Sequence, residues 1–231
     1  MAATSPASRL VTEAARRHLR PLGLRQRGRS RLWLDDHGWW LGVVDFFSPR
    51  WSQGSGLTVG VMWLWQDVGH VTFNVHEKVE GSQEFRHEQQ FAVVMEKLAH
   101  DAEKRVGEFR DRFADLDAVA RALLSRPVRR DDLWGNFNAG VAAALVGKAS
   151  EARERFSAVL AHDSFADWIQ ESQQTAQYLF DASEDPAAVR AWARDAVVSC
   201  RAKLSLGDVP ASADDLCRCS RKNDPQVLPQ N

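Results

Sequence analysis

Residues 39–47 read WWLGVVDFF and residues 57–65 read LTVGVMWLW, and these two apolar runs decide the fold. Neither run repeats its apolar residues at the helical period, so both are predicted strands. A third strand is predicted over residues 70–76, where Val71, Phe73 and Val75 alternate with polar residues. The turn-forming segments DDHG, SPRWSQGSG and QDVG are too short for parallel crossovers, so neighbouring strands are expected to be antiparallel.

The segment LRQRGRSRLWL, residues 24–34, precedes these runs and is predicted as a further strand. Because side chains alternate along a strand, five of them are expected on one face: Arg25, Arg27, Arg29, Arg31 and Trp33. Gly28 indicates a bulge or a close backbone approach. With a bulge, Arg25 and Arg27 would face away from Arg29 and Arg31.

Helical patterns flank the predicted sheet. A helix is expected from an N-cap at Ser8 to a stop before Pro21. After a boundary at GSQ, residues 81–83, an apolar stripe predicts a helix over about 84–113. Further helices are predicted over 116–124 and about 132–147, 150–162, 165–182 and 186–206. The predicted fold class is α+β: an antiparallel meander of three to four strands flanked by helices, followed by an all-α helical-hairpin region.

Three regions are predicted along the chain. Residues 8–127 form an α+β domain, and residues 131–206 form a helical-hairpin region packed on it. The tail over 207–231 is rich in Pro, Asp, Ser and Asn and is predicted to be disordered.

The overall composition restricts the function only weakly. The 231 residues carry a net charge of −1, which gives no general reason to expect nucleic acid or membrane as a partner. No run of about 18 apolar residues predicts a membrane span, and the N-terminus lacks the apolar region of a signal peptide. Three cysteines late in the chain do not form a disulfide framework, so a cytoplasmic location is expected.

Residues 19–64 carry a series of motifs in a fixed order. Pro21-Leu22-Gly23 is followed by Arg27-Gly28-Arg29, by Val44-Asp45-Phe46, by Arg50-Trp51-Ser52 and by Gly60-Val61. This order resembles a bacterial family known only as a domain of unknown function. The resemblance implies an α+β fold and no known activity. The family's typical Gln and two Asn are replaced here, Asp45 standing for one Asn, so a site formed by those residues would be lost.

Residues 137–160, FNAGVAAALVGKASEARERFSAVL, resemble one tetratricopeptide-type hairpin. The small and large packing positions of that repeat match at five residues: Gly140, Gly147, Ala152, Phe156 and Leu160. The repeat's Trp and Tyr positions are Asn136 and Ala143 here. Because such repeats need about three units to be stable alone, this single unit is expected to pack against the rest of the chain.

No catalytic or metal-binding motif is found in the sequence. His70 and His76 are roughly 20 Å apart along a strand, too far for one ion. Cys217-x-Cys219 supplies two ligands at most, and Cys200 lies on an apolar helix stripe. No Gly-x-Ser-x-Gly, P-loop or dinucleotide fingerprint is present. We therefore predict no catalytic residues, no metal and no cofactor.

The candidate functional feature is the arginine and tryptophan surface. Its residues are Arg25, Arg27, Arg29, Arg31, Trp33, Arg50 and Trp51. Two interpretations stay open: the arginines face acidic helices of the same chain or solvent, or they dock an acidic protein. The leading hypothesis is a non-enzymatic protein-interaction module. A nucleic-acid-associated protein using the eight arginines of residues 9–31 is the alternative, and an enzyme with a site at the aromatic sheet face is the third. The sequence determines no oligomeric state.

Overall fold

The computed structural model of the chain describes residues 5–50 and 53–208. A five-stranded antiparallel sheet follows an N-terminal helix and precedes a long run of helices. The prediction of an α+β fold, with helices before and after a meander along the chain, is therefore confirmed. The predicted tail from residue 207 lies outside the described residues except for Gly207 and Asp208.

The sheet is a simple meander in which each strand pairs with the next along the chain. The strands are β1 (Arg25–Gln26), β2 (Leu32–Asp36), β3 (Trp40–Asp45), β4 (Gly54–Trp63) and β5 (Val75–Glu84). The pairing sets Trp40 opposite Trp63 and Val43 opposite Gly60. The two apolar runs that we placed in strands are β3 and β4, in the antiparallel arrangement expected.

The third predicted strand exists and pairs antiparallel with β4, but its predicted bounds of 70–76 are wrong. β5 begins only at Val75 and runs through the segment predicted to be a boundary. Val71 and Phe73 pack on the core from a loop. Asn74 holds that loop to β4: its backbone N–H donates to Val61 O, and its side-chain Oδ1 accepts from Trp63 N. β5 is an edge strand with many charged residues, and such a strand lacks the apolar pattern used for the prediction.

Helix α2 (Glu88–Arg112) covers one face of the sheet, and helix α1 (Pro6–Leu19) packs on α2. Helix α1 begins at Ser5, whose side chain accepts from Ser8 N, so the cap lies three residues before the position predicted. Helix α2 lies along β3, β4 and β5. The apolar stripe predicted for α2 is its buried face, including Phe91, Met95 and Leu98.

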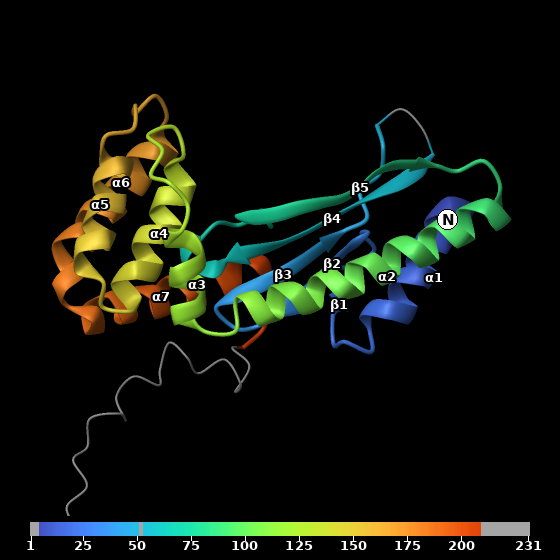
Figure 1. Cartoon of the computed structure of the whole chain (residues 1–231), viewed down its shortest axis with the longest axis horizontal. Helices are drawn as coiled ribbons and strands as arrows, with labels where there is room; N and C mark the ends of the chain where they lie inside the picture. The colour runs from blue at the N-terminus through green and yellow to red at the C-terminus, as the bar shows by residue number, and fades with distance from the viewer. Residues whose placement is uncertain (1–4, 51–52, 209–231) are drawn as a thin grey trace, which may run out of the picture.

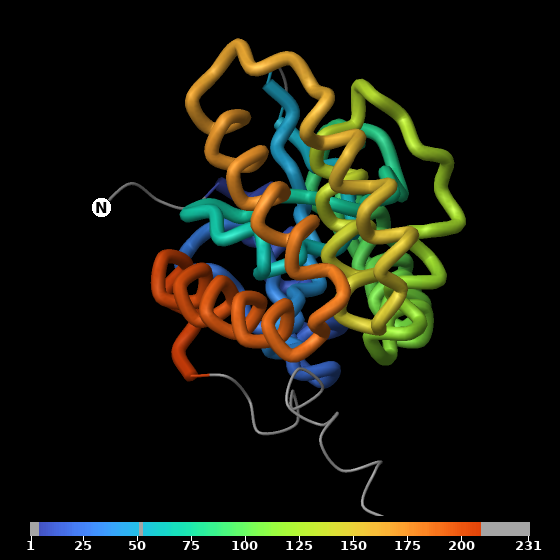
Figure 2. Tube along the Cα trace, turned by 90° about the vertical axis from the view of Figure 1, so that its left-hand side faces the viewer, coloured from blue at the N-terminus to red at the C-terminus, as the bar shows by residue number. Residues whose placement is uncertain are grey.

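The remaining helices form a region at one end of the sheet (Figures 1 and 2). They are α3 (Leu116–Leu124), α4 (Leu133–Leu145), α5 (Ala149–Leu160), α6 (Asp167–Asp181) and α7 (Pro186–Leu204), close to the ranges predicted. Short 3-10 turns, η1 (Leu64–Gln66) and η2 (Ala182–Glu184), follow β4 and α6. In the α4–α5 hairpin, a Cβ atom on Gly140 would lie 2.7 Å from the Phe156 ring, so glycine permits the close contact.

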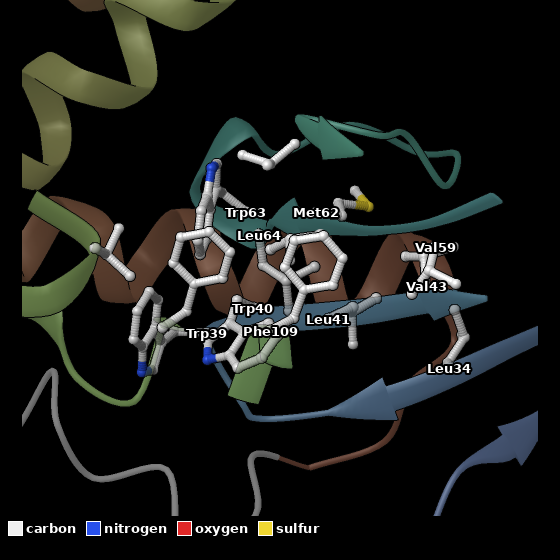
Figure 3. Packing of buried hydrophobic residues seen from close by; sticks show 14 of the residues in the cluster. Leu34, Trp39, Trp40, Leu41, Val43, Val59, Met62, Trp63, Leu64 and Phe109 are labelled. Carbon is white, nitrogen blue, oxygen red and sulfur yellow. The ribbon is translucent and has the colours of Figure 1, made fainter. Parts of the chain in front are cut away.

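Two adjacent aspartates on β2 attach the sheet to helices on its opposite faces. Successive side chains of a strand point to opposite sides. Asp35 accepts two hydrogen bonds from Arg110 of α2, both at 2.8 Å, and Asp36 accepts two from Arg201 of α7 at 2.8 and 2.9 Å. Figure 3 shows α7 behind the strands. The sheet end is thus held between α2 and α7.

Candidate binding cleft beside the sheet

The arginine face predicted for residues 25–33 does not exist in the structure. The chain reverses between β1 and β2, with Gly28 in the left-handed region at φ +56° and Arg27 N donating to Leu32 O. Arg25 pairs opposite Leu34, and Gln26 opposite Trp33. A single strand was wrong because the glycine at the centre of LRQRGRSRLWL forms a turn, which side-chain alternation does not detect.

The members of the predicted surface have separate environments. Trp33 is buried in the core. Arg31 is half-buried, and its guanidinium donates to Gly54 O and Ser8 Oγ at 2.8 and 2.9 Å. Burial lowers the pKa of Arg31, although Asp45 opposes this shift. Arg50 is exposed in the segment between β3 and β4, and Trp51 lies outside the described residues.

The described tryptophans of the sheet are core residues. Trp39, Trp63 and Trp65 stack with one another, with ring centroids 5.4 to 5.9 Å apart. Figure 3 shows Trp39, Trp40 and Trp63 gathered at one end of β3 and β4. This aromatic cluster leads from the sheet to the helical region, because Trp65 Nε1 donates to Asn138 Oδ1 of α4 at 2.9 Å.

Beyond Trp65 the molecule is hollowed by a cleft of about 520 Å³. Its floor is the segment 65–68 after β4, and α4, α6 and α7 contribute its aromatic walls. In Figure 2 this teal segment lies beside the orange helices α6 and α7. We call this the tryptophan cleft, after the tryptophans that line it: Trp65, Trp134, Trp168 and Trp192. A second hollow of about 520 Å³ adjoins it and shares Gln66, Val68, Trp134 and Trp168 as lining residues.

The outer wall of the cleft is a stacked aromatic pair, one ring of which is exposed. Trp134 and Trp168 stack with centroids 6.1 Å apart and an interplanar angle of 11°. Trp168 is 48% exposed, which is unusual for so large an apolar side chain. An exposed aromatic surface beside a hollow marks a binding site more often than a single scattered apolar residue does.

The floor of the two hollows carries buried polar atoms without partners. These atoms are Gln66 Nε2, Asp67 Oδ1 and Thr72 Oγ1. A buried polar atom without a hydrogen bond costs free energy, and most such atoms in proteins are satisfied. Asp67 also has φ +53°, a conformation uncommon for a residue other than glycine. A donor, an acceptor and a hydroxyl therefore lie unpaired beneath the surface of the segment that floors the two hollows.

Charge in the tryptophan cleft is mainly negative. Lys203 Nζ pairs with Asp67 Oδ2 at 2.8 Å and also donates to Asp67 O. Glu171 and Asp195 are exposed lining residues, and neither carboxylate forms an ion pair in the part of the chain that the structure describes. Tryptophan faces beside free carboxylates suit a cation, because the ring face and the carboxylate both attract positive charge.

The cleft does not contain an activated nucleophile. Ser172 Oγ donates to Trp168 O, and Thr175 Oγ1 donates to Glu171 O, so both hydroxyls bond to their own helix. Within residues 5–50 and 53–208, no serine or threonine hydroxyl lining the cleft is hydrogen-bonded to a histidine. Nearby Cys200 is buried, and its Sγ lies 3.4 Å from Val68 O. Burial raises the pKa of this thiol to about 11.

Sequence reasoning missed this cleft because its walls come from four separate elements. One signal was present: Trp134, Trp168 and Trp192 stand in a helical region that is otherwise rich in alanine. Small residues suit close helix packing there, whereas three large rings need space that such packing does not provide.

None of the helices in the described residues combines the length and apolar character needed to cross a bilayer. No family model matches the sequence, and comparisons with curated proteins and with solved structures also found no match. The resemblances to a domain of unknown function and to a tetratricopeptide hairpin therefore stay predictions.

Proposed function

We propose that this protein is a cytoplasmic, non-enzymatic interaction module that binds a basic segment of a partner protein in the tryptophan cleft. The observation that carries the proposal is Trp168, nearly half exposed and stacked on Trp134 beside unpaired carboxylates. A lysine or arginine side chain would lie against the tryptophan face, with its charge toward Glu171 or Asp195.

The buried polar atoms support a peptide as the occupant. A peptide main chain offers both N–H donors and C=O acceptors. Gln66 Nε2 could donate to such a carbonyl, and Asp67 Oδ1 could accept from such an N–H, once a bound peptide moved the residues that cover these two atoms. Aromatic anchors surrounded by polar groups are typical of protein interfaces, in which a few residues supply most of the binding free energy.

The test uses two fluorescently labelled peptides of equal length, one with alternating Arg and Ala and one with alternating Glu and Ala. We expect saturable binding of the basic peptide alone, measured by fluorescence anisotropy. Trp168→Ala should weaken binding about thirtyfold, the loss typical of an interface hot spot, and Glu171→Gln should weaken it less. Tyr178→Ala is the matched control, because Tyr178 is an exposed aromatic residue of α6 outside the cleft lining.

Equal binding of both peptides, or binding of the basic peptide that survives Trp168→Ala, would count against the cleft as the site. Failure of the basic peptide to bind at all would reject the proposed occupant. Circular dichroism of Trp168→Ala separates loss of binding from loss of fold.

The β1–β2 hairpin supports a second candidate function, docking of an acidic protein segment. Arg25, Arg27 and Arg29 form no ion pair with any described residue, although the chain is almost neutral overall. Three arginines on a short hairpin are few for a nucleic acid, because tight salt-dependent binding uses about six to ten phosphate contacts. The double variant Arg27→Glu, Arg29→Glu should keep its melting temperature but lose binding of a polyglutamate peptide. Binding of single-stranded DNA instead would favour the nucleic-acid alternative.

A further inference from the structure

Three potential metal ligands meet where the last turn of α1 lies against α2. His18 comes from α1, and His100 and Glu103 come from α2. One ligand atom from each residue lies within 4.8 Å of the other two. The helices run side by side at this place in Figure 1, so the cluster rests on two packed elements. We propose, in place of the sequence-based prediction of no metal, that His18, His100 and Glu103 form a site for one transition-metal ion of the zinc class.

The distances between these atoms are close to those a bound ion needs. His18 Nδ1 lies 2.8 Å from Glu103 Oε2, and His100 Nδ1 lies 3.9 Å from the same oxygen. In a tetrahedral zinc site with bonds of about 2.0–2.1 Å, neighbouring ligand atoms are about 3.3–3.4 Å apart. These two distances each need a shift of about half an ångström, and the ligand atoms of the two histidines lie within 4.8 Å of each other. The His100 side chain is 70% exposed and can turn to make it.

The His18 ring lies between two carboxylates. Both ring nitrogens face carboxylate oxygens: Nδ1 faces Glu103, and Nε2 faces Glu96 Oε2 at 3.2 Å. A metal-bound histidine usually donates its other N–H to a carboxylate, which fixes the ring orientation. Glu96 occupies that outer position.

The charged residues around the cluster are consistent with a bound metal ion. Arg17 forms an ion pair with Glu96, so the outer carboxylate is already neutralised. Glu103 contacts the two histidine rings and has no Lys or Arg partner among the described residues. Glu96, His100 and Glu103 are spaced four and three residues apart, which places them on one helix face. Glu and His pairs three residues apart also hold metals in helical bundles.

The ligand set selects the class of ion. Imidazole nitrogen suits zinc, copper, iron and nickel, whereas magnesium and calcium prefer sites made of oxygen atoms. Three protein ligands leave the fourth position of a zinc ion to water. The bound ion would fasten the end of α1 to α2, where their contact is otherwise apolar packing and surface ion pairs.

The test uses untagged full-length protein in which Cys217 and Cys219 are replaced by serine, so that their thiols do not compete for metal. Titration with Co²⁺ is followed by the visible absorption of a tetrahedral site, and Zn²⁺ is titrated in competition. We expect one equivalent per chain and no response to Mg²⁺. His100→Ala and Glu103→Gln should abolish the absorption. Glu96→Gln should weaken binding about tenfold to a hundredfold.

His76→Ala serves as the matched control, because His76 is an exposed histidine of β5 outside the cluster. It should bind Co²⁺ as tightly as the parent. The proposal is overturned if the parent binds less than about one equivalent, or if His100→Ala retains the tetrahedral spectrum. It is also overturned if His76→Ala weakens binding as much as His100→Ala does. A Zn²⁺-dependent rise in melting temperature should occur in the parent and be absent in Glu103→Gln.

Discussion

Replacing Arg201 by alanine should destabilise the protein strongly, because this side chain ties α7 to the sheet. The Arg201 side chain is 3% exposed. Besides the two hydrogen bonds to Asp36, its guanidinium donates to the carbonyls of Gly38 and Asp208 at 2.9 and 2.8 Å. Alanine would leave the Asp36 carboxylate and these carbonyl oxygens without their donor.

The magnitude follows from the burial of the pair. Removing one partner of a buried ion pair costs about 3–5 kcal/mol. The Asp36 side chain is 28% exposed and can be partly hydrated, so we expect the lower end, about 3 kcal/mol. For a chain of this size, that loss lowers the melting temperature by roughly 6 to 12 °C.

Urea unfolding followed by tryptophan fluorescence measures the loss. Arg129→Ala is the matched control, since Arg129 pairs with Asp131 at the same 2.8 Å distance but both side chains are exposed. That variant should unfold like the wild type. In the double variant Arg201→Ala, Asp36→Ala, the loss should be smaller than the sum of the two single losses. A loss below about 1 kcal/mol for Arg201→Ala would refute the attachment of α7 through this pair.

Three further predictions concern single sites. Burial raises the pKa of Asp35, but hydrogen bonds from Arg110 and a neighbouring histidine outweigh it, so the pKa is lowered overall. This contribution to stability should be complete above about pH 4 and disappear as the pH falls further. In Asp35→Asn, the free energy of unfolding measured with urea should therefore fall less steeply below about pH 4 than in the wild type. Cys200 should resist alkylation at pH 8 until urea is added, with the two later cysteines replaced by serine, since burial raises its pKa to about 11; rapid labelling of folded protein would contradict this. Gly60→Ala should lower the melting temperature, because a Cβ atom would lie 2.4 Å from a backbone oxygen of β5, whereas Gly81→Ala meets no atom within 4 Å and should not.

The sequence by itself determined the element types with strong local patterns. Two apolar runs predicted β3 and β4, and the stripe beginning at Phe91 predicted α2, because each pattern has its own period. Asp-Pro at residues 185–186 placed the start of α7, where Asp185 caps the helix. These signals depend only on neighbouring residues, and the structure did not alter them.

Only the tertiary structure decided which elements, distant from one another in the sequence, are in contact. Turn geometry at Gly28 separated the arginines, and pairing with β4 placed β5 along a charged segment that has no strand pattern of its own. Trp65 and Trp168 approach the same cleft from residues about a hundred positions apart, and His18 approaches His100 across a similar separation. Such contacts depend on how whole elements pack, and no local period encodes them.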